Sequence, residues 1–132
     1  MINFSSEADG ERYNFFVSGD YFETGEEKTI VYEETIENSA TLKTELKIVN
    51  NDFAVFTRKG DFSSILEFKK NYISDTVYRT PYGSFDMRIV TKDLLFREQG
   101  HFINLKIEYE SDISGYRSRN SMDIIIKLLQ EV

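Results

Sequence analysis

A strict alternation of apolar and polar residues recurs along almost the whole chain and limits the folds that the chain can adopt. From Leu42 to Ile48, every even position is apolar or threonine and every odd position is lysine or glutamate. The same period of two recurs at 85–91, 103–109 and 122–128. Since successive side chains of a β-strand point to opposite faces, this pattern predicts half-buried strands. No long helical pattern competes with it.

Short turn signals separate the alternating runs. They lie at Asp9-Gly10, Gly25-Glu26, Asn50-Asn51, Lys59-Gly60, Lys70-Asn71, Gln99-Gly100 and 111–118. The strands predicted between them are 2–6, 11–23, 27–35, 41–49, 52–58, 62–69, 71–80, 83–97, 101–110 and 118–129. Hairpin-length connections favour an up-and-down meander, and closure would remove its unpaired edges. We therefore predict an all-β fold: a single closed antiparallel up-and-down barrel of about ten strands, one domain over 1–132, with a sandwich as the alternative.

Turn lengths decide which face of each strand points inward. Two-residue turns at Asn50-Asn51 and Lys59-Gly60 would place Ile48 opposite Phe53 and Thr57 opposite Phe62. The residues predicted on the inner face are then Phe53, Val55, Leu66 and Phe68, and those predicted on the outer face include Ala54, Phe56 and Ile65.

The facing of the segment 71–80 depends on the same reasoning, and two registers remain open. A two-residue turn at Lys70-Asn71 pairs Phe68 with Ile73 and turns Ile73, Asp75, Val77 and Arg79 inward. A turn one residue longer turns inward Tyr72, Ser74, Thr76 and Tyr78 instead. The sequence does not choose between them.

Composition argues against several classes of partner. The formal net charge of -7 disfavours binding to nucleic acid and to anionic membrane surfaces. The acidic excess lies in residues 1–66; a solvated outer face explains it, and a surface for a basic partner is the alternative. The chain has no cysteine, hence no disulfide and no thiolate metal site. Residues 1–10 lack the features of a secretory signal, so we expect a cytoplasmic protein.

No arrangement typical of an enzyme, cofactor or metal site stands out. The single histidine, His101, follows Gly100 in a predicted turn, where a histidine-based triad would have no support. Adjacent acids such as Glu33-Glu34 point to opposite faces of a strand and cannot act as a catalytic pair. A phosphate-binding glycine loop and a Gly-x-Ser-x-Gly elbow are absent. We expect no enzymatic activity, no cofactor and no metal.

The segment Tyr78-Arg79-Thr80-Pro81-Tyr82-Gly83 is the sharpest local motif and contains the only proline. Proline at the second position of a turn and glycine at the fourth suit a tight turn between two strands. In the functional interpretation, its polar groups gather at one mouth of the barrel, where a ligand would enter. The turn is the favoured interpretation.

At this motif the chain resembles the YwiB-like bacterial proteins of unknown function. The resemblance is carried by the motif itself, by the alternation of Phe85, Met87, Ile89 and Thr91, and by Ile107-Glu108-Tyr109 and Asn120-Ser121-Met122-Asp123-Ile124. It extends over nearly the whole chain. It implies a small cytoplasmic barrel of the calycin, lipocalin-like type, and it implies no catalytic residues. The Gly-x-Trp signature of lipocalins is absent, because the chain has no tryptophan.

Two hypotheses of function are favoured over a third, an enzyme that uses tyrosine, arginine and carboxylate groups alone. In the first, the protein is a non-enzymatic binding module whose interior holds a small apolar or amphipathic ligand, and the candidate contacts are Tyr78, Arg79, Thr80, Tyr82 and Tyr109. Arg79 would pair with an anionic head group if its strand faces inward. In the second, aromatic side chains plug the barrel, and the outer face binds a second copy of the chain or another protein.

Overall fold

The computed structural model of the protein is all-β. It describes residues 2–8, 10–36 and 40–128, so Asp9 of the first predicted turn and Leu129 of the last predicted strand lie outside the described residues. Eleven strands follow one another: β1 (Ile2–Ala8), β2 (Glu11–Val17), β3 (Gly19–Thr24), β4 (Glu27–Ile36), β5 (Ala40–Val49), β6 (Phe53–Lys59), β7 (Ser64–Lys69), β8 (Tyr72–Thr80), β9 (Gly83–Gln99), β10 (Phe102–Ile113) and β11 (Tyr116–Lys127). In this part of the chain, no helix is long and apolar enough to cross a membrane.

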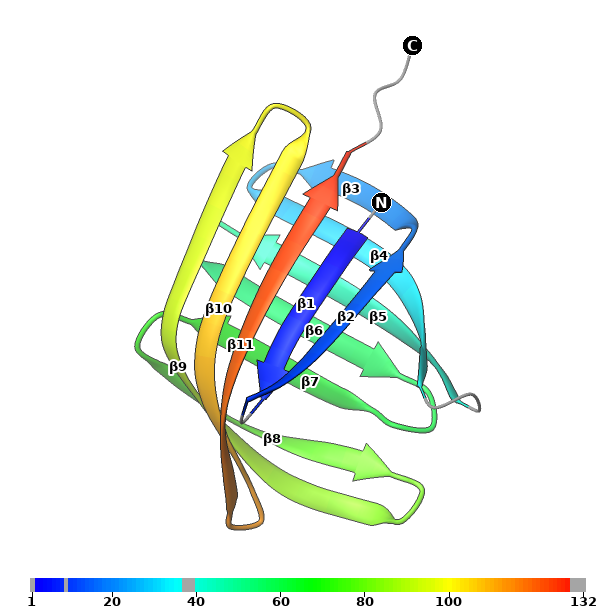
Figure 1. The fold of residues 1–132 in the computed structure, drawn as a ribbon, viewed down its shortest axis with the longest axis vertical. Helices are drawn as coiled ribbons and strands as arrows, with labels where there is room; N and C mark the ends of the chain where they lie inside the picture. Colours follow the sequence, from blue (N-terminus) through cyan, green and yellow to red (C-terminus); the bar gives the residue numbers. More distant parts are fainter. Residues whose placement is uncertain (1, 9, 37–39, 129–132) are drawn as a thin grey trace.

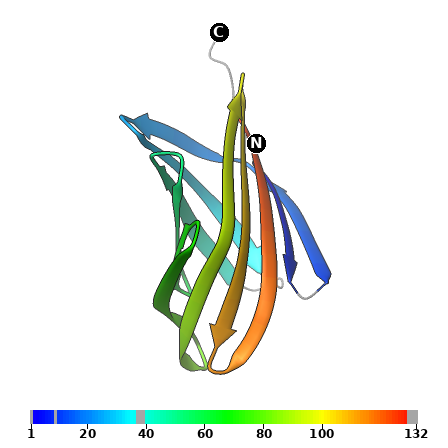
Figure 2. The same ribbon diagram turned by 90° about the vertical axis from the view of Figure 1, so that its left-hand side faces the viewer.

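The strands form two antiparallel sheets that pack face to face (Figure 1, Figure 2). The six-stranded sheet has the order β2-β1-β11-β10-β9-β8, and the five-stranded sheet has the order β3-β4-β5-β6-β7. In Figure 1, most strands of the six-stranded sheet run along the long axis of the molecule, and those of the five-stranded sheet run across them. Such crossing is typical of sheets whose corners are made by strands that pass from one sheet to the other.

Neighbours in sequence are also neighbours around the ring of strands, as in the predicted meander. The first and last strands pair, with Ile2 opposite Ile126. The ring is nevertheless interrupted at two seams. No ladder joins β2 to β3, and β8 is joined to the five-stranded side by the isolated bridge Ser63–Arg79. The predicted closed barrel is therefore not confirmed, because the described residues form two sheets and neither sheet closes on itself.

The seam between β2 and β3 explains why the predicted strand 11–23 is two strands. The chain leaves the six-stranded sheet at Val17 and enters the five-stranded sheet at Gly19. A Cβ atom at Gly19 would lie 2.5 Å from the carbonyl oxygen of Val31, so this close approach requires glycine. Because the two sheets cross, one straight strand cannot keep its register with both of them.

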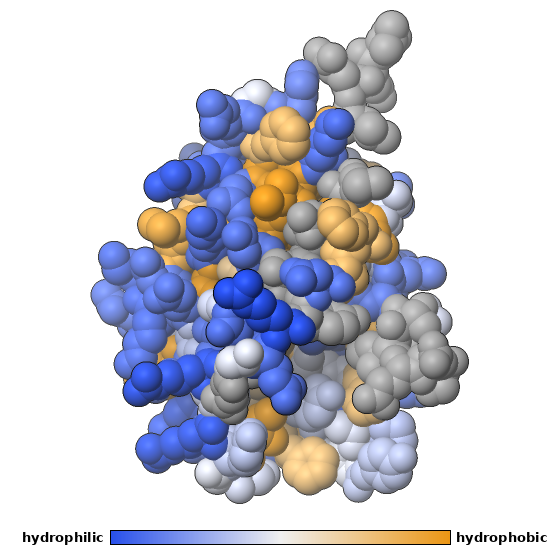
Figure 3. Space-filling view, in the orientation of Figure 1, coloured by the Kyte–Doolittle hydropathy of each residue, from blue (hydrophilic) through white to orange (hydrophobic). Residues whose placement is uncertain are grey.

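One apolar core fills the space between the sheets. Its buried residues are Ile2, Ile30, Tyr32, Leu46, Ile48, Ala54, Phe56, Leu66, Phe68, Ile89, Leu94, Ile103, Leu105, Ile107, Met122, Ile124 and Ile126. The outer surface in the view of Figure 3 is mainly hydrophilic, with hydrophobic residues gathered toward its upper part. This division into an apolar inner face and a polar outer face is what the period of two predicts.

The inward face of β6 differs from the prediction because the preceding turn is longer. Ile48 lies opposite Ala54, and three residues, Asn50, Asn51 and Asp52, connect β5 to β6. Both asparagines adopt a positive φ, 54° and 60°, which asparagine tolerates better than most residues. The additional residue reverses the alternation along β6.

The predicted faces of β6 were therefore wrong. Ala54 and Phe56, expected on the outer face, are completely buried in the core. Phe53 and Val55, expected inside, are half-buried on the opposite face. Ile65 of β7 is exposed, as expected.

The connection from β6 to β7 is also longer than the predicted two-residue turn. Thr57 lies opposite Ile65 and not opposite Phe62. This second reversal restores the expected alternation, so Leu66 and Phe68 are buried as predicted.

Strand β8 adopts the second of the two registers that the sequence left open. The pairing of Phe68 with Ile73 does not form, because the chain changes sheet between β7 and β8 and β8 pairs with β9. Ser74 is buried and Thr76 and Tyr78 are half-buried, whereas Ile73 is exposed. The odd-numbered residues of β8, including Arg79, consequently face outward.

Candidate functional site

A row of polar side chains crosses the inner face of the five-stranded sheet. Tyr32 lies opposite Thr44, Thr44 opposite Arg58, and Arg58 opposite Ser64. Each of the four lies an even number of residues from a core position on its own strand. Their side chains therefore point to the same face as the apolar core. The interior of the molecule is therefore polar at this level.

The six-stranded sheet contributes polar side chains to the same part of the interior. Thr91 lies opposite Tyr109, and Tyr109 lies opposite Asn120. Burial raises the pKa of Tyr78 and of Tyr109, and the positive charge of Arg58 on the facing sheet acts against this increase at both. We call Tyr32, Glu34, Thr44, Arg58, Tyr78 and Tyr109 the interior polar cluster.

The interior polar cluster contains one pair of opposite charges. Nη2 of Arg58 lies 3.9 Å from Oε1 of Glu34, and the two side chains are 26% and 10% exposed. The hydroxyl of Thr44, which is completely buried, donates a hydrogen bond of 3.1 Å to the same carboxylate oxygen. The pair therefore brings one basic and one acidic side chain into the cluster, and the acidic one also accepts a hydrogen bond.

Three buried polar atoms of this region have no hydrogen-bond partner. They are the Tyr32 hydroxyl, Nε of Arg58 and Oγ1 of Thr91. Buried polar groups in folded proteins are nearly always satisfied, and an unmade hydrogen bond costs about 1–3 kcal/mol. The interior polar cluster and the adjoining threonine therefore have unused capacity for hydrogen bonds.

The three tyrosines of the cluster are neutral hydrogen-bonding groups at neutral pH. Burial raises the pKa of Tyr32, Tyr78 and Tyr109, and the charge of Arg58 opposes this increase at each of them. At Tyr32 the Glu34 carboxylate raises the pKa further, by its negative charge and by a contact with the hydroxyl that falls short of a regular hydrogen bond. Each hydroxyl consequently keeps its proton and can donate a hydrogen bond.

Aromatic rings connect the interior polar cluster to the apolar core. The ring centroids of Phe56 and Phe68 are 5.7 Å apart, and those of Phe68 and Tyr109 are 4.8 Å apart, both in edge-to-face geometry. On the side of the β8–β9 hairpin, Phe62 stacks with Tyr78 at 6.3 Å. The polar groups are thus bordered by an apolar wall.

The candidate ligand contacts from the sequence separate into two groups. Tyr78 and Tyr109 both belong to the interior polar cluster, one from each end of the run β8–β10. Arg79 lies on the outward face of β8 and is exposed, so the condition for its pairing with a head group inside the barrel is not met. Its backbone forms the bridge to Ser63, with two hydrogen bonds of 2.9 Å.

The remaining two candidates form the hairpin turn that the motif predicts. Thr80 lies opposite Gly83, which leaves Pro81 and Tyr82 as a two-residue turn. The amide of Tyr82 donates to the Thr80 hydroxyl (3.1 Å), and that hydroxyl donates to the Gly83 carbonyl (3.0 Å). The hydroxyl of Thr80 is therefore engaged in the turn, and Tyr82 is exposed to solvent.

Sequence reasoning did not identify Tyr32, Glu34 or Arg58 as site residues. A signal existed for the first two, since Tyr32 and Glu34 continue the even-numbered alternation of 28–34. Arg58 was not recognised because the prediction made the turn at Asn50-Asn51 one residue too short. With that turn, the even-numbered residues of β6 would face outward.

A second buried cation, Lys28, lies at the other end of β4. Its side chain is 8% exposed, and its ammonium group lies 3.3 Å from Oδ1 of Asn51, 3.7 Å from Glu23 and 3.9 Å from Glu98. It also lies 5.5 Å from the centre of the Phe96 ring. Because Glu98 belongs to the six-stranded sheet, this ion pair links the two sheets.

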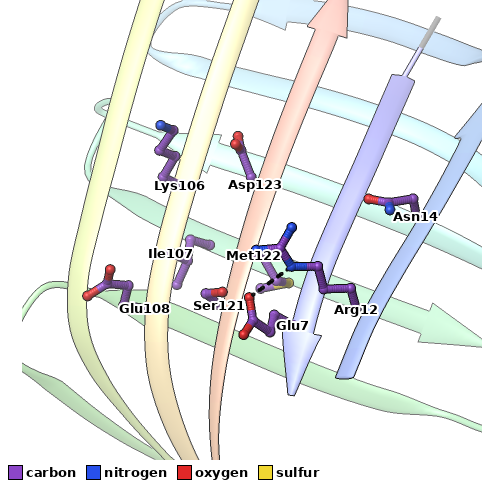
Figure 4. A pocket seen from close by; sticks show the side chains of 9 residues that line it. All are labelled: Glu7, Arg12, Asn14, Lys106, Ile107, Glu108, Ser121, Met122 and Asp123. Atoms are coloured by element: carbon purple, nitrogen blue, oxygen red, sulfur yellow. Dashed lines mark ion pairs between the residues drawn. The ribbon is translucent and has the colours of Figure 1, made fainter. Parts of the chain in front are cut away.

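The hollows on the outer surface differ from this interior site. One of about 370 Å³ is lined by side chains of both charges, with Arg12 3.5 Å from Glu7 (Figure 4). Both of these side chains are substantially exposed, so water can satisfy them. His101 is exposed in a turn, as expected. No group of three histidine or acidic residues suitable for a metal ion occurs within the described ranges.

Comparison with known proteins places the chain in a family. The model of a domain of unknown function, DUF1934, matches residues 2–124. The crystal structure of the ywiB protein from Bacillus subtilis is similar, with a TM-score of 0.81 and 18% sequence identity over 98% of this chain and 89% of that chain. At this identity the likeness shows the fold alone. No curated protein matches. The YwiB-like resemblance is thus confirmed, and the chain belongs to the DUF1934 family.

Proposed function

We propose that this protein is a non-enzymatic binding module that holds one small amphipathic molecule between its two sheets. The polar part of the ligand would lie against the interior polar cluster, and its apolar part would lie against Phe56 and Phe68. In this proposal the protein is cytoplasmic, uses no cofactor, and forms a calycin-like barrel whose two seams can widen to admit the ligand.

The unpartnered atoms of the interior carry this proposal. The Tyr32 hydroxyl and Nε of Arg58 are buried without a hydrogen-bond partner in a fold that satisfies other interior groups well. Asn120, for example, donates to Ser111 at 3.0 Å, and Ser111 and Ser118 lie 2.8 Å apart. A ligand with an oxygen acceptor would supply the missing partners.

Exposure along β8 and β9 indicates a route to the cluster. The inward positions of β8 become less buried toward the hairpin, from Ser74, which is buried, to Thr76 and Tyr78, which are half-buried. On β9, Phe85 of the same inner face is exposed. The adjacent seam is held by the Ser63–Arg79 bridge, so few backbone hydrogen bonds need to break for it to open.

Native mass spectrometry of the gently purified protein, compared with its denatured mass, tests the proposal. We expect a reproducible excess mass on the wild-type protein. The double variant Glu34→Gln/Arg58→Gln removes both charges of the cluster together and leaves neither ion unpaired. It should fold and should lose the excess mass.

The matched control is the pair Glu27–Lys47, a 4.0 Å ion pair that joins β4 to the adjacent strand β5 on the outer face of the same sheet. Glu27→Gln/Lys47→Gln should keep the excess mass. A wild-type protein that carries no bound mass, either alone or after incubation with mixed cellular lipids and metabolites, would contradict the proposal.

The second candidate function is an interaction protein that acts through its outer face, for instance as a homodimer. Two of the three apolar residues that the sequence offered for such a surface are not available, because Ala54 and Phe56 lie in the core. The exposed side chains of Ile65 and Phe22 on the outer face of the five-stranded sheet favour it. A ligand-free dimer in the same spectra would support this alternative.

A further inference from the structure

We propose that the polar group of the ligand is uncharged, such as a hydroxyl or an amide, and not a carboxylate or a phosphate. This inference rests on the proposed function and specifies the chemical class of the ligand. The juxtaposition that carries it is a half-buried Arg58–Glu34 pair beside unpartnered hydrogen-bonding atoms.

The local charge is already balanced. Nη2 of Arg58 already lies 3.9 Å from a carboxylate oxygen of Glu34. Glu34 is 10% exposed and also accepts a hydrogen bond from Thr44. An anionic head group would therefore bring a second negative charge to a single guanidinium group in a poorly solvated place.

The unused groups fit a neutral partner. Nε of Arg58 is a donor, whereas the Tyr32 hydroxyl can both donate and accept. One hydroxyl or amide group supplies an acceptor for Nε and a donor or acceptor for Tyr32 without adding charge. A neutral group also avoids most of the desolvation cost that an ion would incur on leaving water.

A titration with two probes of the same straight chain tests the inference. The probes are a medium-chain primary alcohol and the corresponding carboxylate, at a pH near neutral where the acid is ionised. We expect the wild-type protein to bind the alcohol about tenfold more tightly, or more. Tighter binding of the carboxylate would overturn the inference and leave the proposed function intact. Failure of both probes to bind would contradict the proposed function itself.

Glu34→Gln provides a test in the opposite direction. Removal of the carboxylate charge leaves Arg58 without its counter-ion, so the preference should move toward the carboxylate by about tenfold or more. Glu27→Gln, which removes a carboxylate from the outer face of the same strand, should leave the preference unchanged. An unaltered preference in a folded Glu34→Gln protein would show that the charge balance at Arg58 does not select the ligand.

Discussion

Two cations of the inner face, the buried Lys28 and the half-buried Arg58, differ in how many partners surround them. Lys28 has two carboxylates, one amide oxygen and an aromatic ring around its ammonium group. Arg58 has one carboxylate at 3.9 Å, and its Nε has no partner. They lie on the same sheet, about 13 Å apart along the direction of β4, because Arg58 is level with Tyr32.

The difference indicates different roles. A buried ion with a complete set of partners stabilises one arrangement, and Lys28 does so by joining β4 to Glu98 of the other sheet. An incomplete set leaves an energetic cost that a ligand can relieve. Polarity alone therefore does not identify a site in this fold, whereas unsatisfied polarity does.

The largest expected effect comes from the core that both regions share. Phe68 contacts the rings of Phe56 and Tyr109 and is completely buried. Phe68→Ala should lower the free energy of unfolding by about 3–5 kcal/mol, because it leaves a cavity. Ile65→Ala, on the exposed face of the same strand, is the control and should cost less than about 1 kcal/mol. Urea denaturation measures both, and equal losses would contradict the assignment of faces.

Lys28→Met should lower the free energy of unfolding by about 1–3 kcal/mol, since it removes the ion pair between the sheets. The loss is moderate because Glu23 and Glu98 are half-exposed and can be solvated. Bound mass in native spectra should be unchanged. A stable variant that loses the ligand would reverse the roles that we assign to the two cations.

Tyr32→Phe should show the opposite pattern. It removes a buried hydroxyl that has no partner, so we expect the free energy of unfolding to change by no more than about 1 kcal/mol. Ligand binding should weaken measurably in the same protein. A large loss of stability in urea would mean that the hydroxyl has a structural partner.

Alkaline pH should lower the free energy of unfolding, because tyrosines near both Lys28 and Arg58 have raised pKa values. Burial, followed by the hydrogen bond to Glu23, raises the pKa of Tyr21 near Lys28 from 10.0 to about 12, and burial also raises the pKa of Tyr32. A raised pKa means that the folded state binds the proton more tightly. The resulting stability is complete below about pH 10 and is lost as the pH rises through the folded-state pKa values.

Unfolding measured between pH 8 and pH 12 should therefore show a decline that begins near pH 10. Tyr21→Phe and Tyr32→Phe should each flatten it, because each variant removes one titrating hydroxyl. A decline that is identical in all three proteins would exclude these tyrosines as its cause.

The smallest effect is expected at Arg79, the residue that the sequence suggested as the partner of a head group. Its side chain is exposed on the outer face of β8. Arg79→Ala should change the free energy of unfolding by less than about 0.5 kcal/mol and should leave ligand binding unchanged. Loss of binding would place the site outside the interior.

The sequence predicted much of the fold, and its error about the inward face of β6 has one cause, the length of a turn. The alternation identified the strands, and the Thr80-Pro81-Tyr82-Gly83 turn formed as its residue types predict. The predicted register was wrong at Asn50-Asn51, where asparagine is compatible with a two-residue or a three-residue turn. A difference of one residue exchanged the two faces of β6 and concealed Arg58.

The candidate site could be predicted in part for the same reason. Tyr109 was found because it continues an alternating apolar run, and Tyr78 because it belongs to the polar motif at the β8–β9 hairpin. Glu34 and Arg58 were missed, because a charged residue in a strand is usually solvated. Their pairing depends on β5 lying between β4 and β6 in the sheet. A local sequence pattern does not indicate this arrangement.

The sequence by itself determined that this chain forms antiparallel strands in sequential order with one apolar face, since the period of two is a local property of neighbouring residues. Only the tertiary structure decided that the ring of strands divides into two sheets, and that Lys28 is satisfied while Arg58 is not. The physical reason is that sheet crossing, turn length and hydrogen-bond satisfaction depend on contacts between residues far apart in the chain.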